Sequence, residues 1–528
     1  MTLAQVLNGV KLRGEIAPGW ASLMVAGLEY DSRRVKKDFV FFAFSGSRAD
    51  GRKFADDAIT QGACAIVSES PCPVGYRESF AAPWIEVEHG RHALAIAARN
   101  FYRKPDERVA FTGITGTNGK TTTAYLIDAM LRATGKTTAM IGTIEYRLAG
   151  ERMPAPNTTP ESLDVLRMAE ELVARGGSHL TMEVSSHALA LGRVYGFAFH
   201  TAVFTNLTRD HLDFHGSMED YAAAKRLLFQ SRPEPEWIIL NADDPASGQM
   251  ARSSAAPNTS HPEHSEGSAF SVASTGSGSP HLIRYGLNKS ADLRAENIRS
   301  AFEGLSFDAV YQGERVPVSS PLVGRVNVSN ILAALGAGLS YGISLAEAAR
   351  GIATCTAVPG RFERIDEGQP FLVLVDYAHT DDALRNAIQI VRELTRGRVI
   401  TLFGCGGDRD RSKRPLMGMA AAELSDLTVL TSDNPRSESP LDIMNDALVG
   451  LRRFDTPCFA EPDRARAIHK ALEQAHAGDA VLLAGKGHET YQILKDRTIH
   501  FDDREVARDV LRSMGYSKED KRGHKKPE

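Results

Sequence analysis

Short apolar runs alternate with helical stretches along most of this 528-residue chain. Residues 39–44 and 180–184 are two such runs, each bounded by polar or small residues, which is typical of buried strands. In other segments apolar residues recur every three to four positions; Ile127, Met130 and Leu131 share one face of such a helix. Alternating strands and helices favour a mostly parallel sheet covered by helices, so the pattern predicts an α/β fold.

The same pattern divides the chain into three domains and a tail. Apolar runs at 371–375, 398–403, 427–431 and 480–484 indicate that a second sheet, resembling a Rossmann fold, follows the central one. Residues 253–281 are rich in Ser, Gly, Pro, Asn and His, so we expect a flexible surface insertion there. The predicted boundaries are 1–106 for a small N-terminal α/β domain, 107–355 for the central domain, 356–516 for the C-terminal domain and 517–528 for a charged tail.

Composition narrows the class of protein. Hydrophobic residues make up 42% of the chain and charged residues 24%, with a net charge of −4, which suits a soluble enzyme and disfavours a general nucleic-acid binder. No apolar run is long enough to span a membrane, and the first ten residues lack the pattern of a secretion signal. The five cysteines are scattered and form no metal-type pair, which favours a reducing cytoplasmic setting.

The most informative motif is a glycine-rich turn between a predicted strand and a predicted helix. Residues 112–123 have the sequence Thr-Gly-Ile-Thr-Gly-Thr-Asn-Gly-Lys-Thr-Thr-Thr. Glycines let backbone N–H groups converge on an anion, Lys120 adds positive charge, and Thr121 carries a hydroxyl for a magnesium ion. Because Ile114 stands where the strict P-loop pattern has glycine, a turn without a ligand is the alternative. Gly119 followed by Lys120 favours a nucleoside triphosphate site.

Polar motifs follow several predicted strands at their carboxyl ends, where ligands gather in open α/β sheets. In the central domain, Glu183 ends one strand and His211 follows another, and both could complete a magnesium site with Thr121. Magnesium prefers oxygen ligands, so a buried, hydrogen-bonded histidine is an equal interpretation of His211. Lys225 lies on a predicted helix at 217–229, where a lone lysine is usually solvated.

The loop at 115–122, Thr-Gly-Thr-Asn-Gly-Lys-Thr-Thr, resembles that of the Mur ligase family, cytoplasmic ATP-dependent enzymes that form amide bonds in peptidoglycan synthesis. The resemblance covers nearly the whole chain apart from the insertion and the tail. It implies three domains: an N-terminal domain that binds uridine diphosphate, a central P-loop-type domain that binds ATP and a C-terminal domain that binds an amino acid. The residues it implies around ATP are Gly116, Thr117, Asn118, Gly119, Lys120, Thr121, Thr122, Asn327, Asn330, Arg361, Asp376 and His379.

The resemblance also implies two magnesium ions and a modified lysine. Lys225 matches a family lysine that reacts with CO2, and the resulting carbamate supplies oxygen ligands that a bare lysine lacks. The implied metal ligands are Thr121, Glu183, His211 and Lys225 as its carbamate, and the implied catalytic residues are Lys120, Lys225 and His211.

Further segments resemble the family's site for a UDP-linked muramoyl dipeptide. Family members often have glutamine where this chain has Leu191, so one polar contact differs. The residues implied at this site are Tyr30, Ser32, Ser47, Arg48, Ala49, Asn157, Thr158, Thr159, Ser185 and Arg193.

Asp433-Asn-Pro-Arg436 resembles the signature of family members that add meso-diaminopimelate. The distal carboxylate of this amino acid needs a cation such as Arg436, which would repel the ammonium end of L-lysine. The implied reaction joins diaminopimelate to the D-glutamate γ-carboxylate of UDP-N-acetylmuramoyl-L-alanyl-D-glutamate through an acyl phosphate. The residues implied around the amino acid are Arg409, Asp433, Asn434, Pro435, Arg436, Gly485 and Glu489.

Three alternatives stay open at this point. They are an L-lysine-adding ligase of the same family, a folylpolyglutamate synthase and, from another class, a nucleotide-binding regulatory module without catalysis. The joint presence of Lys120, Glu183, His211 and Lys225 disfavours the last. We expect small-molecule substrates, a monomer, and neither a nucleic-acid nor a membrane partner.

Overall fold

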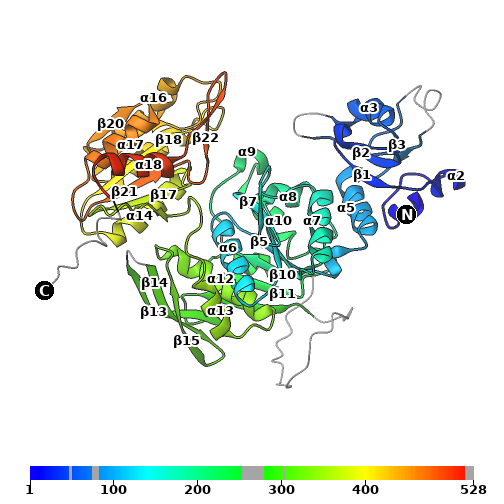
Figure 1. Cartoon of the computed structure of the whole chain (residues 1–528), viewed down its shortest axis with the longest axis horizontal. Helices are drawn as coiled ribbons and strands as arrows, with labels where there is room; N and C mark the ends of the chain where they lie inside the picture. The colour runs from blue at the N-terminus through cyan, green and yellow to red at the C-terminus, as the bar shows by residue number, and fades with distance from the viewer. Residues whose placement is uncertain (47–49, 74–81, 252–278, 302–303, 518–528) are drawn as a thin grey trace. The chain divides into compact units, whose positions relative to one another are not determined.

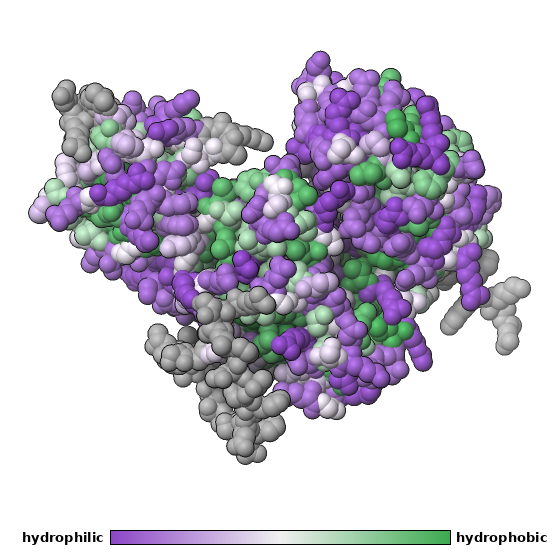
Figure 2. Space-filling model, turned by 180° about the vertical axis from the view of Figure 1, so that it is seen from behind, coloured by the Kyte–Doolittle hydropathy of each residue, from purple (hydrophilic) through white to green (hydrophobic). Residues whose placement is uncertain are grey.

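The computed structural model describes residues 1–46, 50–73, 82–251, 279–301 and 304–517. The chain forms two compact units, which are described separately below (Figure 1). The first unit consists of Met1–Arg294 with Leu332–Gly351, and the second of Ala295–Ile331 with Ile352–Glu528. No helix among the described residues is long and apolar enough to cross a bilayer. On the face drawn in Figure 2, hydrophilic residues predominate at the surface.

The N-terminal sheet has four parallel strands in the order β1-β2-β3-β4. Alternate side chains of β2 point to opposite faces, so that Val40 and Phe42 pack with α5 and Phe41 and Ala43 pack with α3. The strand expected at 39–44 is confirmed. The elements are α1 Leu3–Val6, α2 Pro18–Ala21, β1 Gly27–Glu29, η1 Ser32–Arg34, β2 Phe39–Ala43, η2 Gly51–Phe54, α3 Ala55–Thr60, β3 Ala63–Ser68, β4 Trp84–Glu86, α5 Gly90–Phe101 and η3 Pro105–Glu107.

In the central sheet, β5 lies between β9 and β10, and all three strands run parallel. Ile114 on β5 is opposite Glu183 on β9 and Val203 on β10. The glycine-rich loop that leaves β5 therefore emerges between the carboxyl ends of two neighbouring strands. The strands of the first unit run in the order β12-β11-β10-β5-β9-β6-β7-β8, with β7 and β8 antiparallel. They are β5 Ala110–Thr115, β6 Thr138–Ile141, β7 Glu145–Leu148, β8 Glu151–Pro154, β9 His179–Glu183, β10 Phe199–Phe204, β11 Trp237–Asn241 and β12 His281–Gly286.

Helix α6, Lys120–Ala133, follows the loop directly. It begins at Lys120, after Gly119 in the left-handed conformation, and ends before Gly135, whose φ of 79° suits glycine. The other central elements are α7 Ser162–Ala174, α8 Ser186–Ala190, α9 Leu212–His215, α10 Met218–Arg226, α11 Ser247–Met250, β13 Leu293–Ala301, the antiparallel pair β14 Gly304–Tyr311 and β15 Glu314–Ser320, α12 Val326–Ser340 and α13 Leu345–Ile352.

Two expectations for the central domain need correction. The strand predicted before the glycine-rich turn is β5, Ala110–Thr115, which extends into residues 112–123 because buried Thr112 and Thr115 continue the pairing with β9 and β10. The C-terminal boundary of the insertion predicted at 253–281 is wrong, because residue 281 belongs to a strand. His281 is the first residue of β12, and its ring stacks on Trp237 with centroids 4.5 Å apart, so it is not a loop histidine. Residues 253–278 of that prediction lie outside the described residues.

The C-terminal sheet is covered by helices on both faces. Its order is β16-β17-β21-β18-β19-β20. The strand β16 is antiparallel to β17, and the other five strands run parallel. From β17 to β20 the chain moves across the sheet in one direction, and right-handed crossovers place α14, α15 and α16 on one face. From β20 it crosses back over the sheet to β21, so the same handedness places α17 on the other face. The strand residues confirm this, since Leu372 and Leu374 pack with α14 while Val373 and Val375 pack with α17 and α18.

The four strands predicted in this domain are confirmed. The elements are β16 Glu363–Arg364, β17 Leu372–Asp376, α14 Asp381–Leu394, β18 Val399–Cys405, α15 Lys413–Leu424, β19 Leu427–Ser432, α16 Pro440–Leu451, β20 Cys458–Glu461, α17 Arg464–Glu473, β21 Ala480–Ala484, β22 Tyr491–Ile493, β23 Thr498–His500 and α18 Asp503–Ser513.

Candidate active site

The glycine-rich loop is shaped by its contact with the segment that follows β10. Gly116 has a φ of 151°, and a Cβ there would lie 1.9 Å from Thr205 Oγ1, so no other residue fits this position without rearrangement. Thr117 N donates to Asn206 O at 2.8 Å, and Asn118 N donates to Asn206 Oδ1 at 2.8 Å. The strand end thus holds the loop backbone in one conformation. Asn206 was not among the predicted site residues.

Lys120 lies at the first position of α6, and its side chain returns to the loop. Its Nζ donates to the carbonyl oxygens of Gly116 at 2.8 Å and Thr117 at 2.9 Å. Lys120 therefore lies over the glycine loop at the N-terminus of a helix. From this position its ammonium group can reach the phosphates of a bound nucleotide.

Glu183 and Thr121 meet at the end of β9, as the sequence predicted. Glu183 is 1% exposed and accepts from Thr121 Oγ1 at 3.0 Å, Thr143 Oγ1 at 3.1 Å and Thr143 N at 2.8 Å. A carboxylate beside hydroxyl oxygens is a donor set that suits magnesium, which completes its shell with phosphate and water oxygens. Thr143 was missed by the sequence analysis, although its place just after the apolar run 139–141 marks a strand end.

Lys225 is buried, so the interpretation as a solvated lysine is wrong. The side chain is 1% exposed, its Nζ donates to Gly116 O at 2.8 Å, and it lies 4.3 Å from the centre of the Tyr221 ring. Burial, with Lys120 nearby, lowers the pKa of Lys225 well below its usual value. Only the neutral amine adds to CO2, so this environment favours the species that a carbamate needs.

His211 lies beside this cluster in a left-handed conformation, with φ at 54°. Its side chain is 46% exposed, which rules out a fully buried histidine, and its Nε2 lies 3.5 Å from Asp210 Oδ2. Its ring centre is 4.9 Å from that of His187 and 6.1 Å from that of Tyr221. Partial burial outweighs the attraction of Asp210 and lowers the pKa of His211 to about 4, so it is neutral at pH 7.

Among the described residues, no three His, Cys, Asp or Glu side chains converge on one metal-sized position. A magnesium ion at this loop would have to be held by Thr121, Glu183, the nucleotide and any carbamate on Lys225, rather than by a preformed cluster of charged ligands among the described residues.

The residues predicted for the muramoyl dipeptide gather around Thr159. Its Oγ1 donates to Glu183 O at 2.9 Å and accepts from Ser185 N at 3.0 Å, and its carbonyl accepts from Arg193 at 2.9 Å. Asn157 and Thr158 precede it, and Leu191 caps the end of α8.

The N-terminal residues predicted for the UDP moiety are described only in part. The Tyr30 hydroxyl donates to Asp164 on α7, and burial raises the pKa of Tyr30. Ser32 begins η1 and is buried. Predicted residues 47–49, which include Ser47, Arg48 and Ala49, lie outside the described residues.

In the second unit, the residues predicted around ATP lie in two places. Asp376 and His379 are at or just after the end of β17 with Arg361 nearby, and Asn327 and Asn330 are in the first turns of α12. Asp376 ends β17 and accepts from Phe362 N and Ala378 N, both at 2.9 Å, while burial raises its pKa. Arg361 lies 4.9 Å from the centre of the Tyr377 ring, and the His379 ring is 4.6 Å from that ring. Asn330 Nδ2 donates to Asn327 Oδ1 at 2.9 Å.

The side chains of two arginines, Arg436 and Arg409, lie beside Gly406 at the carboxyl end of β18. A Cβ on Gly406 would lie 3.1 Å from Arg436 Nη1 and 3.7 Å from Arg409 Cγ. Arg436 has a φ of 52° and donates from Nη1 to Gly407 O at 2.7 Å. Within the described part of the chain, neither arginine forms an ion pair with a carboxylate. The pair is therefore suited to bind a carboxylate from outside.

Acidic and amide groups lie in the same strand-end cluster. Asp433 and Asn434 are buried after β19, and Asn434 Nδ2 donates to Glu489 Oε2 at 2.8 Å. Gly485 follows β21 with a φ of 114°, and a Cβ there would lie 2.8 Å from Asp433 Oδ2. Sequence analysis missed Lys486, which is fully buried among these groups.

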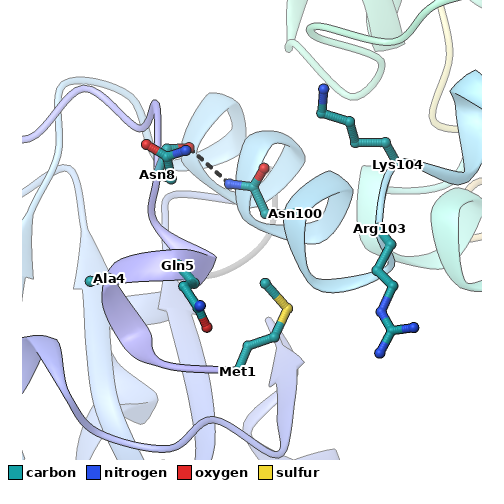
Figure 3. Close-up of a pocket in the computed structure, with 7 residues that line it drawn as sticks. All are labelled: Met1, Ala4, Gln5, Asn8, Asn100, Arg103 and Lys104. Atoms are coloured by element: carbon teal, nitrogen blue, oxygen red, sulfur yellow. Dashed lines mark hydrogen bonds between the residues drawn. The ribbon is translucent and has the colours of Figure 1, made fainter.

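A separate cavity of about 710 Å³ lies near the N-terminus and contains none of the predicted site residues. Figure 3 shows Arg103 and Lys104 pointing in different directions from the end of α5, while Asn100 donates to Asn8 O at 2.8 Å. Lys104 is paired with Glu107 at 3.0 Å, so the lining does not converge on a ligand.

Comparisons with known proteins agree with the geometry. Three family models match: the Mur ligase family catalytic domain over residues 24–102, the Mur ligase middle domain over 114–338 and the Mur ligase glutamate ligase domain over 360–487. The UDP-N-acetylmuramoyl-L-alanyl-D-glutamate--2,6-diaminopimelate ligase of Solibacter usitatus is 59% identical over 98% of this chain and 99% of its own length. The enzyme of the same name from Geobacillus kaustophilus is 44% identical over 93% of this chain and 96% of its own.

Solved structures show the same likeness. A structure of a UDP-N-acetylmuramoyl-L-alanyl-D-glutamate--2,6-diaminopimelate ligase aligns with a TM-score of 0.68 at 31% identity, covering 98% of this chain and 100% of that one. A MurF structure from Acinetobacter baumannii aligns with a TM-score of 0.62 at 18% identity over 92% of this chain and 95% of its own, a likeness of fold alone.

Proposed function

The chain belongs to the Mur ligase family, and we propose that it is the ATP-dependent ligase that adds meso-2,6-diaminopimelate to UDP-N-acetylmuramoyl-L-alanyl-D-glutamate in peptidoglycan synthesis. The observation that carries the choice of amino acid is the position of Arg409 and Arg436 beside Gly406. Arg436 Nη1 also lies 3.5 Å from the carbonyl oxygen of Asn434, whose side chain binds Glu489 and which follows Asp433. This arrangement offers cations to the distal carboxylate of diaminopimelate and carboxylates to its distal ammonium.

The nucleotide binds at the loop between β5 and α6 in this proposal. Loop N–H groups and Lys120 hold the phosphates, and Thr121 with Glu183 would hold magnesium. Magnesium, when bound, offsets negative charge on the phosphates. A carbamate on Lys225 would supply further oxygen ligands from within 3 Å of the loop, since Lys225 Nζ lies 2.8 Å from Gly116 O.

The reaction proceeds by two displacements. The D-glutamate γ-carboxylate attacks the γ-phosphorus of ATP, which releases ADP and forms an acyl phosphate; Lys120 and the loop amides stabilise the charge that develops. The amine of diaminopimelate then attacks the acyl carbon, a C–N bond forms, and inorganic phosphate leaves. The amine must lose a proton on the way. Neutral His211 can accept one, although its pKa of about 4 makes it a weak base.

The L-lysine-adding alternative is weaker on charge grounds. L-lysine ends in an ammonium without a carboxylate, which would leave two guanidiniums uncompensated beside a third cation. A monomeric, cytoplasmic enzyme is part of the same proposal and follows from the family resemblance. A folylpolyglutamate synthase structure from Mycobacterium tuberculosis shares the fold at 16% identity, which supports no common substrate.

An amino-acid panel tests the proposal directly. Purified protein is incubated with ATP, magnesium and the UDP-linked dipeptide, together with meso-diaminopimelate, L-lysine or no amino acid. The masses of the products are measured by mass spectrometry. We expect product only with diaminopimelate, and ADP release that requires both cosubstrates. Preferential use of L-lysine, or ADP release without the dipeptide, would overturn the assignment.

A further inference from the structure

Lys486 is a buried cation at the amino-acid pocket. It follows Gly485 at the carboxyl end of β21, and its side chain is 0% exposed. Its Nζ lies 3.1 Å from Glu489 Oε2, 3.2 Å from Asn434 Oδ1 and 3.8 Å from Asp433 Oδ1. A buried ammonium is costly unless it is paired and hydrogen-bonded, and here oxygens from two different strand ends supply that pairing.

The contacts of Lys486 determine where Glu489 and Asn434 point. Asn434 Oδ1 accepts from Lys486 Nζ and from Ile493 N at 2.9 Å, while its Nδ2 donates to Glu489 Oε2. Glu489 Oε2 thus receives two donors from inside the protein. Among the described residues, none donates to Glu489 Oε1, so this oxygen is left for a ligand.

The charges of the pocket disfavour a further cation. Asp433 and Glu489 carry two negative charges, whereas Arg409, Arg436 and Lys486 carry three positive charges. The distal centre of diaminopimelate is a zwitterion and adds no net charge to this balance. The end of L-lysine is a bare ammonium, which adds a positive charge to the excess to which Lys486 contributes, and a buried site tolerates such an excess poorly.

We infer that Lys486 is a specificity-determining positioning residue: it holds Glu489 and Asn434 in place and cancels one negative charge, so that a zwitterionic terminus is favoured over a bare ammonium. The inference rests on the diaminopimelate pocket proposed above. Lys486 acts through its neighbours and need not touch the substrate.

The test is Lys486→Met, which keeps most of the side-chain volume and removes the charge. We expect the KM for diaminopimelate to rise about 10- to 100-fold, the loss associated with a hydrogen bond to a charged group, and the KM for ATP to change less than about twofold. The preference for diaminopimelate over L-lysine, as a ratio of kcat/KM values, should fall. Lys495→Met, an exposed lysine of the same unit, is the matched control and should leave all three quantities unchanged.

Lys486→Gln separates charge from hydrogen bonding and serves if the methionine variant does not fold. Its amide can still donate to Glu489, so the KM for diaminopimelate should partly recover while the preference over L-lysine stays reduced. An unchanged preference in both variants would overturn the inference. A different result would contradict the diaminopimelate pocket itself: wild-type protein that does not use diaminopimelate, or an Arg436→Ala variant with an unchanged KM for diaminopimelate.

Discussion

In the proposed function, the glycine loop of the first unit and the arginine pocket of the second would bind their ligands by different physical means. The loop relies on backbone N–H groups, threonine hydroxyls and a lysine, Lys225, whose pKa burial lowers. The pocket relies on buried side-chain charges that pair with one another, as Lys486 pairs with Glu489. Backbone recognition suits a phosphate chain common to many enzymes, whereas paired charges can distinguish amino acids that differ by one carboxylate.

The largest effect expected from this comparison is at Lys225. Lys225→Ala removes the buried amine beside Gly116. We expect kcat to fall more than about a thousandfold, because the proposed carbamate ligands of a phosphate-bound magnesium would be lost. Added bicarbonate should not restore the variant, whereas wild-type protein depleted of CO2 should recover with it. Turnover is measured as ADP release. The control is Lys136→Ala, an exposed lysine just after α6; wild-type rates in Lys225→Ala would remove the carbamate from the mechanism.

Arg436→Ala addresses the second unit. The loss of the guanidinium proposed to bind the distal carboxylate should raise the KM for diaminopimelate about 100-fold, with a change in the KM for ATP of less than about twofold. Steady-state kinetics with each substrate varied in turn measure the split. Arg452→Ala, exposed at the end of α16, is the matched control. Equal changes in both KM values would mean that the amino acid binds elsewhere.

Acid should weaken the first unit more than the second. Among the described residues, six histidines of the first unit and one of the second have a lowered pKa. The one in the second unit is His488. Those in the first unit are His92, His179, His187, His200, His211 and His215. The pKa of His179 falls to about 4 through burial, against 6.5 when unfolded. Between these values the unfolded chain binds more protons, so the free energy of unfolding falls as pH decreases from about 6.5 to 4.

The tryptophans make this prediction measurable, since Trp20, Trp84 and Trp237 all belong to the first unit. The denaturant midpoint followed by tryptophan fluorescence should fall between pH 7 and pH 5 by more than the midpoint followed by circular dichroism. His179→Gln should reduce the shift, and His469→Gln, exposed on α17, should not. Identical shifts for both probes would contradict the difference between the units.

The smallest effect is expected from shortening the insertion. Residues 253–278, replaced by a short Gly-Ser linker, should leave kcat within about twofold, because the entropy of closing a loop changes slowly with its length. The deletion must stop before His281, which pairs with Trp237 at the start of β12. A folded variant without activity would show that the insertion takes part in the reaction.

The parts that sequence predicted best are those in which local chemistry decides the structure. The loop at 115–122 was assigned from its glycines and lysine, and the strand ends at Glu183 and Asp433 were found from apolar runs followed by polar residues. The position of His281 is predicted wrongly because its polar, glycine-rich neighbourhood does not show a strand whose pairing partner, Trp237 on β11, lies more than forty residues earlier in the chain.

The sequence by itself determined the α/β class, the phosphate loop and the family, because periodicity, turn residues and contiguous motifs are local properties of the chain. Only the tertiary structure decided that Lys225 is buried against Gly116, that Thr143 shares Glu183 with Thr121, and that Lys486 lies between Asp433 and Glu489. Burial and pairing of charge depend on which strand ends are neighbours, and neighbours in a parallel sheet are set by crossovers that bring together residues far apart in sequence.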